Sequence, residues 1–121
     1  MLAKKHRFHG HSSLNFTYRR GETIRSPYCA IRFVPGKHET FRVAVVVSKK
    51  VAKSAPDRNR IRRRVYEAIR ELAPKLLTNQ DIVVTIFDEK FLTMPHDELF
   101  ASLKRQLEQM TKTNKEKPKS A

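Results

Sequence analysis

Hydrophobic and polar positions along the chain predict four strands and two long helices. Residues 28–34 and 41–47 are rich in the apolar and aromatic side chains typical of strands, and a short extended segment is predicted at 22–25. Residues 82–87 form an unbroken apolar run, which is typical of a strand buried on both faces. The sequence therefore predicts three well-defined strands and one short one.

The segment between two of these strands predicts a turn. Residues 35–38 read Pro-Gly-Lys-His, a common turn composition, so strands 28–34 and 41–47 are expected to pair as a hairpin. The mixed face of strand 28–34 combines a ring, a small side chain and a guanidinium, so it is either a surface for unstacked bases or an ordinary solvated face. Alternation assigns Cys29, Ile31 and Phe33 to one face and Tyr28, Ala30 and Arg32 to the other.

Helical spacing of apolar residues predicts the first long helix at 56–76. Pro56 suits the first turn of a helix, and Asp57 places an acid where the helix dipole favours one. Pro74 is expected to kink or end this helix about a turn early. The apolar stripe consists of Ile61, Val65, Ala68, Ile69, Leu72 and Leu76.

A second helix is predicted from about residue 95 to residue 109, after a loop at 88–94. Thr93 is the expected N-cap residue. From Thr111 onward the chain has no apolar content to offset the cost of ordering, so residues 111–121 are predicted to be a disordered basic tail. The buried stripe of this helix is expected to be Leu99, Leu103, Leu107 and Met110.

This order of elements predicts an α/β fold of the α+β sandwich type, with one mixed sheet of about four strands packed by two main helices. Residues 1–110 are expected to form a single domain that includes a basic N-terminal arm. The strand–helix–strand segment predicts a parallel βαβ crossover, which the general rule would make right-handed.

Composition narrows the class of partner. The 121 residues include 26 Lys and Arg against 12 Asp and Glu, a formal net charge of +14. So much like charge favours a polyanionic partner, which can be nucleic acid, an anionic membrane or an acidic protein. A membrane partner is disfavoured because the apolar side of the 56–76 helix is better explained by burial against the sheet. The chain has no secretory h-region and no apolar run of membrane-spanning length, so a cytoplasmic location is expected.

The first turns of the 56–76 helix carry a cluster of arginines. On a helical wheel Arg60 and Arg63 project opposite the apolar stripe, while Arg62 flanks it and Arg58 lies near the buried sector. Guanidinium groups match phosphate oxygens in a bidentate manner, so this pattern favours oriented phosphate contacts. The alternative is a charged helix face that serves only solubility, but five arginines precede the first glutamate, Glu67.

The same stretch resembles a family signature. The pattern S-K-K-V-x-K-x-A-x-x-R-N-R-x-K/R-R is similar to that of the protein subunit of bacterial ribonuclease P, the ribonucleoprotein that removes the 5′ leader from precursor tRNA. This chain has Ser48-Lys49-Lys50-Val51, Lys53, Ala55, Arg58-Asn59-Arg60 and Arg62-Arg63 at the matching positions. It departs from the pattern at Pro56, where an aliphatic residue is usual, and at Tyr66, where a basic residue is usual.

The resemblance implies a function and a division of labour. It implies that the RNA subunit performs the hydrolysis with Mg²⁺ bound to RNA, that no metal ligand or catalytic group comes from the protein, and that no protein partner is required. It also implies a rare left-handed crossover. The residues implied to contact the catalytic RNA are Lys49, Lys50, Lys53, Arg58, Asn59, Arg60, Arg62 and Arg63; those implied to contact the precursor leader are Phe8, Phe16, Tyr18, Tyr28 and Arg32.

Three alternatives compete with this function. Pro56-Asp57 with Asp88-Glu89-Lys90 formally matches the PD…(D/E)xK pattern of metal-dependent nucleases, but Asp57 is expected to open a helix and Asp88 a loop. Histidines 6, 9 and 11 suggest zinc, yet Cys29 is the single cysteine and a fourth ligand is not evident. A basic RNA-binding module without enzymatic function, such as a ribosomal protein, fits the composition equally well.

Overall fold

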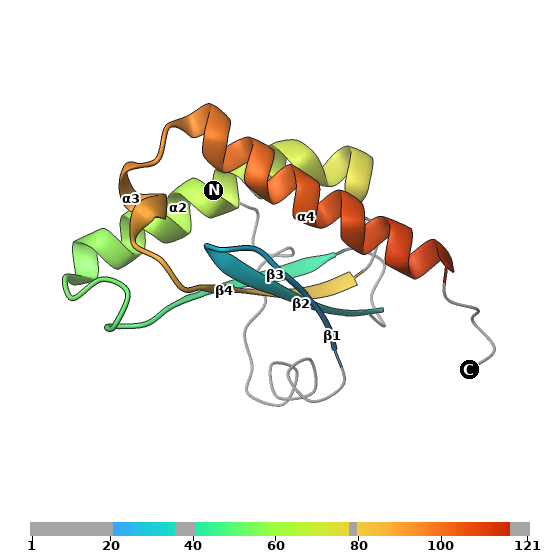
Figure 1. Ribbon diagram of the computed structural model, residues 1–121, viewed down its shortest axis with the longest axis horizontal. Coiled ribbons are helices and arrows are strands. Elements are labelled where there is room, and N and C mark those ends of the chain that lie inside the picture. Colours follow the sequence, from blue (N-terminus) through green and yellow to red (C-terminus); the bar gives the residue numbers. More distant parts are fainter. Residues whose placement is uncertain (1–20, 36–40, 78–79, 117–121) are drawn as a thin grey trace.

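The computed structural model describes residues 21–35, 41–77 and 80–116. These residues form a four-stranded sheet and two long helices, and both helices lie on the same face of the sheet (Figure 1). The elements are β1 (Glu22–Arg25), β2 (Cys29–Pro35), β3 (Arg42–Val47), α2 (Ala55–Leu76), β4 (Gln80–Ile86), α3 (Lys90–Thr93) and α4 (His96–Glu116).

The sheet is mixed, with the strand order β1-β2-β4-β3. Strand β2 pairs antiparallel with both β1 and β4, whereas β3 pairs parallel to β4. The predicted α+β class and the parallel crossover are confirmed, but the predicted hairpin is wrong because β4 lies between β2 and β3. The apolar run of β4 is buried on both faces, with Ile82, Val83 and Val84 all fully inaccessible, so this strand occupies the interior of the sheet.

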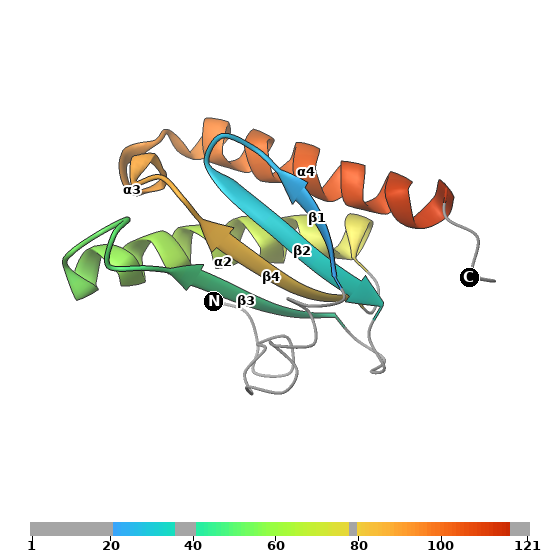
Figure 2. The same ribbon diagram turned by 60° about the horizontal axis from the view of Figure 1, so that its bottom comes forward.

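The crossover from β3 through α2 to β4 is left-handed. Figure 2 views the sheet from the side opposite the helices, with β3 and β4 pointing the same way and α2 behind them. When that view is turned so that both strands point up, β4 lies to the right of β3. With the helix behind the sheet, a right-handed unit would place β4 to the left. The family resemblance implies this rare arrangement, whereas the general rule for βαβ units does not.

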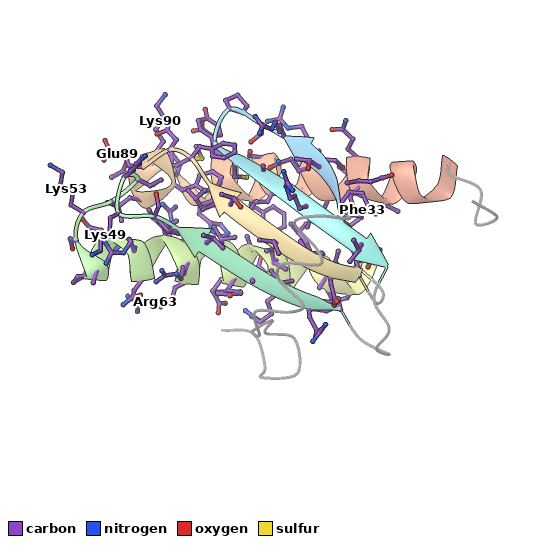
Figure 3. The ribbon with its side chains drawn as sticks, turned by 90° about the horizontal axis from the view of Figure 1, so that it is seen from below. Phe33, Lys49, Lys53, Arg63, Glu89 and Lys90 are labelled. Atoms are coloured by element: carbon purple, nitrogen blue, oxygen red, sulfur yellow. The ribbon has the colours of Figure 1, made fainter. Side chains whose placement is uncertain are left out.

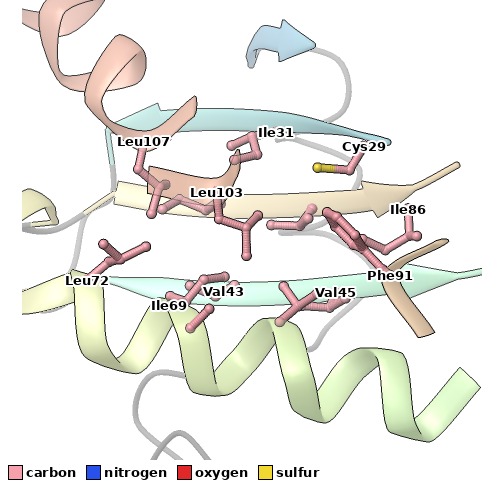
Figure 4. Packing of buried hydrophobic residues seen from close by; sticks show 14 of the residues in the cluster. Cys29, Ile31, Val43, Val45, Ile69, Leu72, Ile86, Phe91, Leu103 and Leu107 are labelled. Carbon is pink, nitrogen blue, oxygen red and sulfur yellow. The ribbon is translucent and has the colours of Figure 1, made fainter. Parts of the chain in front are cut away.

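The main core lies between the sheet and the two helices. Cys29 and Ile31 of β2 point into it, as alternation predicts, and meet the apolar stripes of both helices (Figure 4). Phe33 belongs to the same buried cluster. All four residues of the predicted α4 stripe are fully buried. The helical stripe of α2 is also buried, except that Leu76 is only partly covered and Ala73 is buried in addition.

The start of α2 is capped by a residue that the sequence analysis did not single out. Ser54 is the N-cap, and its Oγ accepts a hydrogen bond from the Asp57 backbone N at 3.3 Å. Pro56 lies in the first turn, as predicted. Pro74 does not end the helix early, because it stands on the exposed side, where water can satisfy the carbonyl that loses its helical partner.

The region before α4 differs from the prediction. Residues 90–93 form a single helical turn, α3, so Thr93 is the last residue of that turn and not the N-cap of α4. The guanidinium of Arg64 fixes this segment to α2 by donating hydrogen bonds to the backbone oxygens of Phe91, at 2.8 Å, and Met94. Phe91 is fully buried, and its burial gives the short turn its place against the core.

Helix α4 also extends further than predicted, to Glu116, through residues that the sequence assigns to a disordered tail. The Thr111 hydroxyl donates to the backbone oxygens of Leu107, at 3.1 Å, and Leu76, at 3.3 Å, so the helix is still attached to α2 at this point. Continuing an existing helix costs little for ordinary polar residues. Residues 117–121 lie outside the described part of the chain.

Strand β2 is fastened to α4 by a buried polar network. The Cys29 thiol donates to Gln106 Oε1 at 3.1 Å, and Gln106 Nε2 donates to the backbone oxygens of Ile24, at 3.1 Å, and Cys29, at 3.3 Å. Burial raises the pKa of Cys29 to about 11, although hydrogen bonds with Ser26 and Gln106 oppose the shift. The thiol is buried on the strand face to which alternation assigns it, and it has a structural partner.

Candidate nucleic-acid interface

The loop from β3 to α2 presents three lysines to solvent. Lys49, Lys50 and Lys53 are all exposed, and Figure 3 shows Lys49 and Lys53 at one end of the molecule. The loop is held in shape by a turn in which the Ser48 carbonyl accepts from the backbone N of Val51 at 3.1 Å. The cations therefore project from a fixed backbone that leads directly into the arginine-rich turns of α2.

Arg58 is the residue that fixes this loop to the helix. Its Nη1 donates to the carbonyl oxygens of Ala52 and Lys53, both at 2.9 Å. The sequence assigns Arg58 to RNA contact, but the structure gives its guanidinium a second task, which is to hold the lysine-bearing loop against the first turn of α2.

The remaining arginines of the predicted set lie on the outer side of α2. Arg60 and Arg63 are exposed, and Arg63 projects from α2 at the edge of the molecule (Figure 3). Arg62 is half-buried, and its Nη1 donates to Asn59 Oδ1 at 2.7 Å, which orients both side chains. The structure thus brings the lysine loop and the segment from Arg58 to Arg63 together at one end of the molecule.

Two other polar side chains of α2 are used by the fold. Arg64 holds α3, as described above, and Tyr66 Oη accepts a hydrogen bond from the backbone N of Val45 at 3.2 Å. Because β3 is an edge strand, this hydroxyl satisfies a backbone group that no neighbouring strand can reach. Tyr66 replaces the basic residue usual in the resembled family, and this contact explains its presence.

The predicted leader-binding residues are only partly described. Phe8, Phe16 and Tyr18 lie outside the described residues. Tyr28 does not share an open face with Arg32: it precedes β2, and its half-buried ring packs on Phe91 with the ring centroids 5.7 Å apart. Arg32 is half-buried on the sheet face opposite the helices, in register with Val83 of β4.

That opposite face is not uniformly solvated. Ala30 is buried, and Ala44 and Val83 form a small buried cluster on which Val46 packs. Neither alternative for this face, a surface for unstacked bases or an ordinary solvated face, therefore describes Tyr28 or Ala30, and Arg32 alone keeps the position that alternation gives it.

One aromatic ring at the end of β4 is exposed, although the sequence pattern does not predict it. Phe87 is 44% exposed, the one large hydrophobic side chain so exposed among the described residues, and the Arg25 guanidinium lies 5.6 Å from its ring centroid. Lys90 Nζ lies 5.8 Å from the neighbouring Tyr28 ring. Phe87 ends an unbroken apolar run, so its sequence context predicts burial; the exposure arises because the strand ends at Ile86.

The acidic residues of the rival nuclease pattern both have structural roles. Asp57 lies in the first turn of α2, and Asp88 Oδ1 accepts a hydrogen bond from the Lys90 backbone N at 2.9 Å. Across residues 21–35, 41–77 and 80–116, no three His, Cys, Asp or Glu side chains come together in a way that could hold a metal ion. No helix in this part of the chain is long and apolar enough to cross a bilayer.

An α+β domain with a hydrogen-bonded lysine loop and a guanidinium-rich helix face is typical of proteins that bind nucleic acid through its phosphates. A family model described as Ribonuclease P matches residues 2–111. The chain belongs to the ribonuclease P protein family.

Relatives and solved structures agree with this assignment. The ribonuclease P protein component of Chloroflexus aurantiacus is 39% identical over 79 residues, which cover 65% of this chain and 58% of that protein. Its counterpart in Chloroflexus aggregans is 34% identical over 89 residues, covering 74% of this chain and 65% of the relative. The match thus spans less than two thirds of the length of these two relatives.

The fold is also that of solved structures in this family. A structure of the Staphylococcus aureus RNase P protein aligns with a TM-score of 0.75 at 22% identity, covering 87% of this chain and 94% of that one. The RNase P protein from Thermotoga maritima aligns with a TM-score of 0.71, also at 22% identity, covering 88% and 96%. At this level of identity the likeness establishes the α+β fold.

Proposed function

We propose that this chain is the protein component of ribonuclease P, which binds the catalytic RNA and the 5′ leader of precursor tRNA and so promotes endonucleolytic 5′ maturation of tRNA. The observation that carries the proposal is the surface formed by the lysine loop and the start of α2. This surface is built on a backbone fixed by Arg58, and it matches the family signature residue by residue.

The proposed surface for the catalytic RNA uses two kinds of cation. Lys49, Lys50 and Lys53 supply point charges, while Arg60 and Arg63 supply planar guanidinium groups that can engage phosphate oxygens in a bidentate manner. Arg62 and Asn59 are already oriented by their mutual hydrogen bond. Arg58 contributes by holding the loop and keeps nitrogen donors beyond Nη1 for the RNA.

The proposed surface for the precursor leader is the sheet face opposite the helices. Its described part carries Arg32 and the exposed Phe87 with Arg25 beside it, a combination of one ring and two guanidinium groups suited to unpaired bases. The residues proposed from the N-terminal arm are Phe8, Phe16 and Tyr18, and Tyr28 is proposed to act mainly by supporting the end of the sheet.

Catalysis is proposed to reside in the RNA subunit. Mg²⁺ held by RNA ligands would stabilise charge on the scissile phosphate and supply the hydrolytic nucleophile. The protein's part is to bring two polyanions together by offsetting their repulsion, which its net charge of +14 suits. Precursor tRNA would be met in the cytoplasm, so a cytoplasmic location is part of this proposal.

Replacing Arg60 or Arg63 with alanine is expected to weaken binding to the catalytic RNA without unfolding the protein. Both side chains are exposed, so no cavity is created. If about six phosphates are contacted, a plot of log affinity against log salt should have a slope of roughly −4 to −5. Each substitution should make this slope less steep by about one unit or less. Fluorescence anisotropy with labelled RNA over a salt series measures the slope.

Arg105→Ala is the matched control for these two variants. It makes the same change in charge at an exposed position of α4, outside the proposed surface. Its slope should stay close to that of the unaltered protein. Slopes unchanged in both the Arg60 and Arg63 variants would remove α2 from the interface.

Arg32→Ala is expected to weaken binding of precursor tRNA by roughly 1–2 kcal/mol, the range for a cation that stacks on a ring away from bulk water. Mature tRNA lacks the leader, so its affinity should barely change. The measurement compares the two ligands on the assembled ribonucleoprotein. Equal losses for both ligands would place Arg32 outside the leader path.

A further inference from the structure

A hollow of about 540 Å³ lies between α2 and the first turn of α4. The two helices are in contact, and Figure 1 shows the start of α4 above α2 on the same side of the sheet. The hollow is shallow and largely open to solvent, so it suits a group that lies on the surface, such as one nucleotide of a bound RNA, and not a fully enclosed small ligand. The lining residues are Arg60, Arg63, Arg64, Glu67, Glu71 and His96.

The lining is divided by charge along α2. The end nearer the start of the helix carries the guanidinium groups of Arg60 and Arg63, both exposed. Neither of these two side chains has a hydrogen-bond or ion-pair partner among the described residues. Paired guanidinium groups at one end of a hollow fit an anionic group such as the phosphate of a nucleotide.

The other end of the hollow carries two carboxylates one helical turn apart. Glu67 is held by Arg70, with Oε2 at 2.9 Å from Nη2, whereas Glu71 is exposed and has no such partner in the described part of the chain. A carboxylate is a hydrogen-bond acceptor only, so it recognises N–H groups. The Watson–Crick edge of guanine presents two adjacent N–H donors that a single carboxylate can accept together, and cytosine and adenine present an amino group.

A ring from α4 completes the lining. His96 is exposed at the start of α4, and its ring centroid lies 6.0 Å from that of Phe100, which restricts where the imidazole can go. An aromatic ring beside a hollow offers a flat surface on which an unpaired base can stack. Phosphate-binding, base-edge and stacking groups therefore line one open hollow that has room for a nucleotide.

We propose that this hollow binds one unpaired nucleotide of the catalytic RNA, preferably guanosine, with its phosphate at Arg60 and Arg63, its base edge at Glu71 and its ring against His96. This inference rests on the proposed function, because it specifies how the RNA subunit is recognised. It adds a base-specific contact to a surface that otherwise binds phosphates without regard to sequence.

Glu71 provides the decisive test, because the proposal and its alternative predict opposite changes in RNA affinity when this side chain is removed. If Glu71 is only a solvated acid beside bound RNA, its removal relieves repulsion of phosphates and tightens binding. If Glu71 accepts hydrogen bonds from a base, its removal weakens binding. One good bidentate pair corresponds to roughly a five- to hundredfold change in affinity.

The test measures affinity and base protection together on the catalytic RNA of ribonuclease P. Glu71→Ala and the isosteric Glu71→Gln are each expected to weaken binding by roughly five- to hundredfold at constant salt. Kethoxal modifies unpaired guanines. The unaltered protein should protect one guanine from this modification, and the same guanine should stay reactive when either variant is bound. His96→Ala should also reduce this protection, whereas Glu108→Ala, the same charge change at another exposed position, should leave it intact.

The outcomes separate this inference from the proposed function. Tighter binding by Glu71→Ala, or a protection pattern that no variant changes, would overturn the inference while the function stands. If the unaltered protein fails to bind this RNA, both are overturned. Each variant should have the same midpoint of thermal unfolding as the unaltered protein. This control establishes that the substitution alters the hollow and not the fold.

Discussion

Replacing Phe91 with alanine is expected to lower the free energy of unfolding by roughly 3–5 kcal/mol, the cost of removing a fully buried aromatic side chain. Phe91 lies in α3, a single turn whose place depends on this ring and on the Arg64 hydrogen bonds. The midpoint of thermal unfolding should fall by roughly 10–20 °C for a domain of this size. Calorimetry or circular dichroism measures the change.

The chain supplies a matched control four residues earlier. Phe87→Ala removes the same side chain from an exposed position, where the loss should be within about 1 kcal/mol, including the contact with Arg25. Equal losses in the two variants would mean that α3 is not packed against the core as described.

Much of the fold follows from local patterns in the sequence. The stripe from Ile61 to Leu72 identifies α2, and Pro56 and Asp57 mark its beginning. These signals are strong because helical spacing, proline tolerance and the interaction of an acid with the helix dipole are properties of neighbouring residues. The apolar run of β4 likewise indicates an interior strand before any pairing is known.

Strand order is where local patterns fail. The turn-like segment at 35–38 predicts a hairpin between β2 and β3, but β4 takes the place between them. The position of β4 depends on how well this apolar strand, which is distant in sequence, is buried between β2 and β3. A short stretch of sequence carries no information about such long-range burial. Thr93 illustrates the same limit: its residue type suits a cap, yet the burial of Phe91 places it inside α3.

The chemistry of the candidate site is evident in the sequence, but the task of each side chain is not. Five arginines in seven positions, with Asn59 among them, indicate phosphate binding. Only the structure shows that Arg58 and Arg64 donate to backbone oxygens of the loop and of α3, and that Tyr66 serves an edge strand. These contacts depend on the positions of backbone groups that belong to other elements of the fold.

The hollow between α2 and α4 could not be found from sequence for the same reason. Glu71 and His96 are separated by two elements of the fold, and each alone resembles an ordinary surface residue. Their association follows from the packing of the two helices. A site assembled across elements becomes visible once that packing is known.

The central claim is that the protein binds and positions RNA while the RNA subunit cleaves. The protein alone is therefore expected to cleave no precursor tRNA at any Mg²⁺ concentration. With the catalytic RNA it should support 5′ maturation at a lower Mg²⁺ concentration than the RNA needs by itself, because protein cations replace part of the counterion requirement. The expected change is from no detectable cleavage to full turnover.

A double variant tests the competing nuclease mechanism in the same assay. Asp57→Asn with Asp88→Asn removes both acids of the formal nuclease pattern, one of which lies in the first turn of α2 and the other in the turn before α3. The reconstituted rate should stay within about tenfold of the unaltered rate, which corresponds to roughly 1.4 kcal/mol on the barrier.

The most direct measurement is the rate of 5′ leader removal from precursor tRNA by RNA-free protein, by the catalytic RNA and by the two combined, over a Mg²⁺ series. The proposal predicts no cleavage by the protein, cleavage by the RNA only at high Mg²⁺, and efficient cleavage by the combination at low Mg²⁺. Cleavage by RNA-free protein that disappears in the Asp57→Asn, Asp88→Asn double variant would contradict it.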